Sequence, residues 1–293
     1  MDGQPPPPPP FPPGQPLPPP PPGIPTASGA RLLALQPMGI GEILDAAIRL
    51  YRARWKSLMA IVAIGLVPIS FLQAFLTRSM GSPFSTEAPI SGDVDGTLIT
   101  SGVLAVIQLL VIQPFLTAAV AKASADTYLG HEVVVGPTFR YAVSRIHSIL
   151  WISILSGLAV LLGFVLLIIP GIIVAIRFVF GSTVLVVEGQ KGTKALGRSW
   201  RLAKGHFWKL FGTLLLANIM ASIVEGVLSV PGTVAFLATG PSGWPFLAIA
   251  TSLAAILTTP FTTLITVLLY FDLRIRKEAF DLEVMAQEMS SPR

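Results

Sequence analysis

The stretch ILWISILSGLAVLLGFVLLII, residues 149–169, decides the fold class of this chain. It contains no charged residue, and a helix of this length crosses the roughly 30 Å hydrocarbon core of a bilayer. The whole sequence of 293 residues has the same character, with 52% hydrophobic residues, 12% charged residues and a mean hydropathy of +0.72. Soluble domains contain about 25% charged residues. The sequence therefore predicts an all-α, polytopic membrane protein.

Five further apolar segments flank this stretch, and the six together predict a bundle of about six transmembrane helices. The expected spans are residues 57–76, 98–120, 149–169, 172–187, 210–230 and 246–270. A span needs about 20 apolar residues, and the fourth segment is shorter and contains Arg177. Residues 149–187 therefore form either two crossings or a re-entrant pair. In both cases we expect a tight hairpin that turns at Ile169-Pro170-Gly171.

Lysine and arginine alternate between the gaps that separate these segments. The alternate gaps 1–56, 121–148, 188–209 and 271–293 hold eighteen of the 20 basic residues. Because Lys/Arg bias in short loops sets the orientation of a membrane protein, we expect both termini in the cytoplasm. The chain would then be a multi-pass protein of the inner (cytoplasmic) membrane. Its net charge of +5 indicates contact with anionic lipids of the cytoplasmic leaflet and not nucleic-acid binding.

Short amphipathic helices are expected on the cytoplasmic surface. Residues 40–56 carry apolar side chains at helical spacing, with Asp45 and Arg49 as an i,i+4 pair and Trp55 at headgroup level. Residues 271–288 predict a second surface helix, in which three i,i+4 pairs of opposite sign are typical of a solvated face.

A weak internal repeat accompanies these helices. Basic stretches lead into the third and fifth spans, and these spans end at Pro170-Gly171 and Pro231-Gly232. The shared direction indicates parallel repeats. The alternative is that any hairpin that enters a membrane from the cytoplasm needs basic residues before it and a turn at its tip.

Residues 1–36 form a proline-rich tail that we expect to be disordered. Fourteen of the first 22 residues are proline, which favours extended polyproline II and cannot pack a core. The tail is either a solvated spacer or a docking strand for a cytosolic partner. The integral membrane domain is expected to follow at residues 37–289.

Catalytic motifs are absent from the sequence. There is no cysteine, and the three histidines have no carboxylate partners at catalytic or metal-ligand spacing. We therefore expect no catalytic, cofactor or metal site and no enzymatic activity. Among the expected spans, Arg177 and Glu225 are the two ionisable groups inside the bilayer, at similar depth. We expect them to pair between the fourth and fifth spans, as a structural ion pair or as part of a substrate path.

Three stretches resemble a known membrane domain family. They are PMGIGEILD at 37–45, Glu188 followed by ALGRSWRL at 195–202, and LLYFDLRIRKE at 268–278. The family is the bacterial membrane domain that precedes the catalytic domain of some glycerophosphoryl diester phosphodiesterases and that also occurs alone, often in actinobacteria. No stretch here matches the soluble phosphodiesterase barrel, so the resemblance carries over no catalytic residue.

The resemblance puts the 268–278 motif at the cytoplasmic face, near the 195–202 stretch. Opposite charges on these two elements predict that they dock, with Glu278 or Asp272 against Arg198 or Arg201. The candidate docking residues are Arg198, Arg201, Asp272, Arg274, Arg276 and Glu278.

These observations predict a non-enzymatic membrane scaffold, or a component that interacts with lipids or partners. The alternative is a small-solute or lipid transporter that uses proline-broken helices together with Arg177 and Glu225. A transporter should have a polar cavity at mid-membrane, whereas a scaffold should have a packed apolar bundle with polar groups at one face. The sequence predicts neither a substrate nor an oligomeric state.

Overall fold

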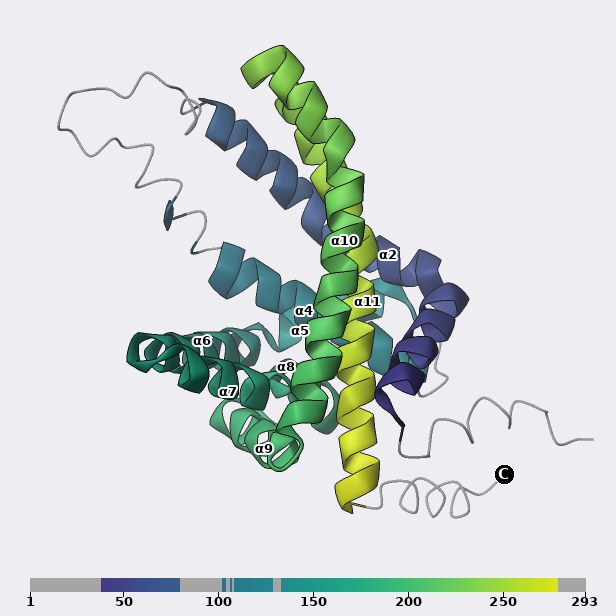
Figure 1. Cartoon of the computed structure of the whole chain (residues 1–293), viewed down its shortest axis with the longest axis vertical. Helices are drawn as coiled ribbons and strands as arrows, with labels where there is room; N and C mark the ends of the chain where they lie inside the picture. Colours follow the sequence, from purple (N-terminus) through teal and green to yellow (C-terminus); the bar gives the residue numbers. More distant parts are fainter. Residues whose placement is uncertain (1–37, 80–101, 104–105, 107, 129–132, 279–293) are drawn as a thin grey trace, which may run out of the picture. The chain divides into compact units, whose positions relative to one another are not determined.

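The computed structural model describes residues 38–79, 102–103, 106, 108–128 and 133–278 (Figure 1). Every element within these ranges is a helix, which confirms the predicted all-α class. The proline-rich tail and the end of the expected second surface helix lie outside the described residues.

Four of the described helical segments are long and apolar enough to cross a membrane, which indicates a membrane protein. They are Ile146–Leu166, Ile168–Glu188, Phe207–Thr239 and Trp244–Glu278. The expected first span lies within a longer helix, and the expected second span is only partly described.

Helix α2 (Ile40–Ser79) joins the expected surface helix to the expected first span. The join is a kink at Arg54, whose φ of −130° and ψ of 22° are not helical. The first turn of the helix contains Glu42, whose carboxylate accepts a 2.7 Å hydrogen bond from the Gly39 N–H, as in a capping box. On the solvent side, Arg49 donates to Asp45 at 2.6 Å.

A π-helical turn (η1, Gln108–Ile112) leads into α4 (Gln113–Tyr128). Pro114 lies directly after this π-helical turn, as the second residue of α4. The helix buries a run of small residues, including Ala118, Ala119 and Ala123, and this lets it pack closely against α2, α8 and α11. A short amphipathic helix, α5 (Val135–Ser144), follows.

Helices α6 (Ile146–Leu166) and α7 (Ile168–Phe178) form the first hairpin. Its turn is the single extended residue Leu167, so the expected turn at Ile169-Pro170-Gly171 is wrong. Pro170 lies instead in the first turn of α7, where proline is tolerated. Gly163 and Gly171 let the two arms approach, because a Cβ on Gly163 would come within 2.9 Å of the Gly171 Cα and one on Gly171 within 2.6 Å of the Phe164 ring.

The return arm of this hairpin breaks after α7 and continues as α8 (Gly181–Glu188). Together the two pieces cover Ile168–Glu188, 21 residues. The expected short fourth segment, residues 172–187, is therefore part of a stretch of full spanning length.

After α9 (Thr193–Ala203), the second hairpin consists of α10 (Phe207–Thr239), a 3-10 turn (η2, Gly240–Gly243) and α11 (Trp244–Glu278). Helix α10 continues through Pro231, so the expected turn at Pro231-Gly232 is also wrong. The chain turns at Gly240, where φ is 63°. Gly232 has the role that Gly163 has in the first hairpin, since a Cβ there would come within 2.7 Å of the Phe246 carbonyl on α11.

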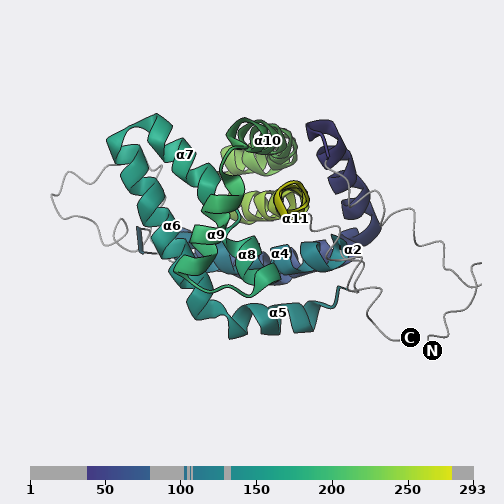
Figure 2. The same ribbon diagram turned by 90° about the horizontal axis from the view of Figure 1, so that it is seen from below.

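Helix α11 is the central element of the core. It contacts α10, α2, α4 and α9, and Figure 2 shows it enclosed among them. Its second half is buried almost without interruption, from Thr263 to Leu273, whereas α6 and α10 expose long apolar faces such as Leu158 and Val227. Those faces are the lipid-facing surface of a membrane bundle.

Candidate functional site

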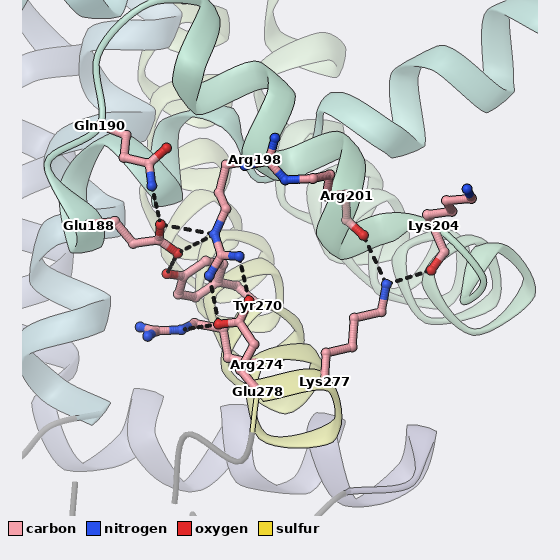
Figure 3. A network of polar contacts seen from close by, with 9 residues as sticks. All are labelled: Glu188, Gln190, Arg198, Arg201, Lys204, Tyr270, Arg274, Lys277 and Glu278. Carbon is pink, nitrogen blue, oxygen red and sulfur yellow. Dashed lines mark hydrogen bonds and ion pairs between the residues drawn. The ribbon is translucent and has the colours of Figure 1, made fainter. Parts of the chain in front are cut away.

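A collar of polar groups surrounds the last turns of α11, at the end of the helix opposite the hairpin turn. Figure 3 shows the part of it around Glu188, Arg198 and Lys277. Such groups are costly next to an apolar core unless they are paired. The collar, as we use the term, consists of Met38, Glu188, Arg198, Lys209, Tyr270, Asp272, Arg274, Arg276, Lys277 and Glu278.

One half of the collar is built on Glu188, the last residue of α8. The Arg198 Nε–H donates to both oxygens of its carboxylate, at 3.0 Å each. The carboxylate also accepts a hydrogen bond from the Gln190 amide at 2.8 Å and one from the buried Tyr270 hydroxyl at 2.7 Å. Glu188 thus ties α8 to α9 and to α11 at a single carboxylate.

Arg198 extends this half to the end of α11. Its Nη2 donates to Glu278 at 2.6 Å, and Arg274 donates to the same carboxylate at 3.3 Å. The hydrogen bond to Glu278, followed by the interactions with Glu188, raises the pKa of Arg198 above its ordinary value against the opposing effect of burial. Arg198 is therefore a permanently charged bridge between two carboxylates from different helices.

The other half of the collar is built on Asp272, which is fully buried. Its carboxylate accepts a 2.7 Å hydrogen bond from the Met38 N–H and shares the Arg276 Nε–H between its two oxygens, at 3.1 Å each. It also forms an ion pair with Lys209. Lys209 and Arg276 also donate to the Met38 carbonyl, at 2.7 and 2.9 Å. This network holds the chain just before α2 against α10 and α11.

Lys277 completes the collar by capping α9. Its ammonium donates to the carbonyl of Arg201 at 2.9 Å and to that of Lys204 at 2.6 Å. These carbonyls are among the unpaired acceptors at a helix C-terminus, where a cation also suits the helix dipole.

Helix α9 is fixed from its other side by the break between α7 and α8. The Ser199 hydroxyl donates to the Arg177 carbonyl at 2.7 Å and accepts from the Phe180 N–H at 3.1 Å. The Arg177 guanidinium lies over the Trp200 ring, 4.5 Å from its centroid. The break in the return arm therefore forms the socket into which α9 packs.

Comparison with known proteins identifies the family. Residues 119–273 match a domain of unknown function, DUF7847. The match covers more than half of the chain. The chain belongs to the DUF7847 family. Neither the curated proteins nor the solved structures contain a match to it.

The DUF7847 match runs from α4 into the last turns of α11 and includes Glu188, Arg198, Lys209 and Asp272. It thus contains both carboxylates on which the two halves of the collar are built. The resemblance to the phosphodiesterase-associated family stays a prediction.

The structure brings together some of the predicted docking residues of this DUF7847 chain. Arg198 contacts Glu278, as expected. Asp272 contacts neither Arg198 nor Arg201 but pairs with Lys209 and Arg276, since it faces the opposite side of α11. Arg201 takes part through its backbone carbonyl.

Sequence reasoning did not predict Glu188, Lys209, Tyr270 or Met38 as docking residues. Glu188 and Lys209 each lie at the end of an apolar segment. A single charged residue at the end of an apolar segment is the signal in the sequence that could have indicated a paired side chain.

The expected pair of Arg177 and Glu225 is not formed. Arg177 lies over Trp200, and the Glu225 carboxylate accepts a hydrogen bond from the Thr258 hydroxyl on α11. The physical reason is that both hairpins turn elsewhere than expected, at Leu167 and at Gly240. This changes the register of the two spans, and Arg177 contacts Ser199 and Trp200 of α9 instead. Among the described residues, no three His, Asp or Glu side chains form a group that could hold a metal.

Proposed function

We propose that this chain is a non-enzymatic scaffold of the cytoplasmic membrane, with about six spans and both termini in the cytoplasm. The observation that carries the proposal is the convergence of α2, α8, α9 and α10 on the last two turns of α11 through the collar. The polar groups of that convergence are engaged with one another, so their best-supported role is to hold the helices in a fixed arrangement.

The Lys/Arg pattern supports a cytoplasmic location for the collar. Exposed tryptophans near the start of three apolar segments give independent support, because Trp favours the membrane–water interface. They are Trp55 after the kink of α2, Trp151 in α6 and Trp208 in α10. Each lies close to an amphipathic basic segment, as expected for a rim at headgroup level.

The scaffold would present basic side chains to anionic lipids of the cytoplasmic leaflet. Residues 1–36 lie outside the described range. They remain the candidate segment for a cytosolic partner, because polyproline II strands bind aromatic-lined grooves with little loss of chain entropy.

One observation favours the alternative of a solute or lipid transporter. Glu225 is exposed on the apolar face of α10, where a carboxyl group is costly. Against this alternative, α10 and α11 continue unbroken through Pro231 and Pro260, and Arg177 does not join Glu225. Uptake of labelled solutes or lipids by liposomes that contain the chain, lost in Glu225→Gln, would favour transport over a scaffold.

The proposed orientation is testable because the sequence has no cysteine. Single cysteines replace Lys204 beside the collar and Ser242 at the tip of the second hairpin, both of which are exposed. A membrane-impermeant thiol reagent added to intact cells should label Ser242→Cys and not Lys204→Cys. The reverse pattern would overturn the orientation.

The scaffold role itself is tested by cross-linking in the native membrane, with the full chain and with a variant that lacks residues 1–30. A partner that is captured by the full chain and lost from the truncated one assigns partner binding to the tail. Capture of the same partners by both variants would assign it to the collar instead. The absence of any stoichiometric partner in either would contradict a scaffold.

A further inference from the structure

A groove lies beside the collar, between the start of α6 and the loop that joins α8 to α9. Its volume is about 800 Å³. The side chains that give it its chemistry are His147, Ser148, Trp151, Lys191, Thr193 and Lys194. Glu188 and Gln190 also line the groove, but their polar groups are already hydrogen-bonded. The Glu188 carboxylate accepts from Arg198, Tyr270 and the Gln190 amide.

The cations of this groove differ from those of the collar. Among the residues that the structure describes, no hydrogen bond or ion pair engages the ammonium groups of Lys191 and Lys194. The side chains of Ser148 and Thr193 are equally without partners in that part of the chain. The Glu188 charge is compensated by Arg198. The groove is therefore a basic pocket with free hydroxyl donors, which suits a phosphate group.

The loop shapes the pocket through glycine. Gly189 and Gly192 have φ of 69° and 57°, which side chains rarely adopt. A Cβ on Gly192 would come within 3.1 Å of the Trp151 ring. The bare backbone at Gly192 thus lets the loop lie directly against Trp151.

An apolar stripe continues from the groove along α6. Trp151, Ile154, Leu158, Leu161 and Val165 are all exposed and follow one another at spacings of three and four residues. They form one face of the helix, which begins at the groove and ends at the hairpin tip. A free phosphate would make no contact with this apolar face, whereas the acyl chains of a phospholipid need an apolar surface of this kind.

We propose that the groove binds the headgroup of an anionic glycerophospholipid, with its phosphate at Lys191 and Lys194 and its acyl chains along the exposed face of α6. Trp151 marks the boundary between the two parts, as amphipathic aromatic rings do at membrane surfaces. This inference deepens the proposed scaffold function, because it rests on the collar being at the membrane surface.

The test is native mass spectrometry of the full chain in detergent, with phosphatidylglycerol and phosphatidylcholine in equal amounts. The wild type should retain phosphatidylglycerol in preference. In the variant Lys191→Ala with Lys194→Ala that preference should fall about thirtyfold, since each lysine near an anionic headgroup contributes on the order of 1 kcal/mol. The matched control, Lys56→Ala with Lys204→Ala, removes two exposed lysines outside the groove and should retain it.

Three results would overturn the inference. An equal loss in both double variants would mean general surface charge. No preference in the wild type would mean that the groove does not select anionic lipid. Displacement of phosphatidylglycerol by inorganic phosphate or glycerol phosphate would mean a site for a soluble anion. Measurement in detergent is independent of orientation and of cytosolic partners, so failure here is distinguishable from failure of the scaffold proposal.

Discussion

The two hairpins of this protein follow one plan but differ in their return arms. Each begins after an amphipathic helix, and each brings its arms together at the glycine of a Pro-Gly pair, Gly171 or Gly232. The first return arm breaks into α7 and α8, whereas the second is the single 35-residue helix α11. The break forms the socket for α9 and places Glu188 in the collar. The unbroken arm, α11, is the helix that the collar surrounds. The first hairpin therefore contributes groups that bind α11, and the second hairpin contains α11 itself.

The largest expected effect is at the unbroken arm. Asp272→Asn keeps the side-chain volume but leaves Lys209 and Arg276 without their shared carboxylate. Breaking a buried ion pair costs about 3–5 kcal/mol of unfolding free energy. The control is Asp45→Asn on the exposed face of α2, where a surface pair contributes less than about 1 kcal/mol. Denaturant unfolding of both variants in detergent checks this, and equal losses would contradict the assigned role of Asp272.

The shared part of the plan is tested by glycine pairs within each outgoing arm. Gly163→Ala and Gly232→Ala force a methyl group into the neighbouring backbone and should each cost about 1–3 kcal/mol. Gly157→Ala and Gly226→Ala have nothing within 4 Å of the added methyl group, and should gain up to about 1 kcal/mol from helix propensity. Thermal unfolding of the four variants measures this. A loss at only one of the two contact glycines would mean that the hairpins do not share this packing.

The connection between the two hairpins is measured by double-mutant cycles on Arg198. Combination with Glu278→Gln should give a coupling of about 0.5–3 kcal/mol, because the two side chains are in contact. Combination of Arg198→Ala with Asp272→Asn should be additive to within about 0.5 kcal/mol, since Asp272 belongs to the other half of the collar. If the second cycle showed the larger coupling, the division of the collar into two halves would be wrong.

The smallest effect is expected at the break itself. Arg177→Ala should cost about 0.5–2 kcal/mol through loss of the contact with Trp200. The charge swap of Arg177→Glu with Glu225→Arg should be no more stable than the two single changes predict, because these residues do not meet. Rescue by the swap, measured by the same unfolding assay, would restore the pairing that the sequence suggested.

The sequence predicted the features that depend on composition and periodicity. Helical class, the amphipathic segment at 40–56 and its Asp45–Arg49 pair all follow from local preferences, and the structure has them. The contact of Arg198 with Glu278 was also predicted, from the opposite charges of two elements that the resemblance puts at the same face.

The predictions that failed concern where a helix stops and what lies beside it. Pro170 and Pro231 were expected to end helices, as they do in water, but one lies in a first turn and the other within α10. In a bundle, neighbouring helices stabilise such interruptions. The i,i+4 pair of Asp272 and Arg276 is typical of a solvated face, and the sequence holds no sign that Lys209 and Met38 cover it.

The attachment of Met38 to Asp272 has a mechanical consequence. The peptide group at this point is held by Asp272, Lys209 and Arg276, which belong to the second hairpin and not to α2. Tension on the proline-rich segment is therefore transmitted to α10 and α11 before it reaches the helix that follows in the chain. A force applied to the tail would therefore act directly on α11, the central helix of the bundle.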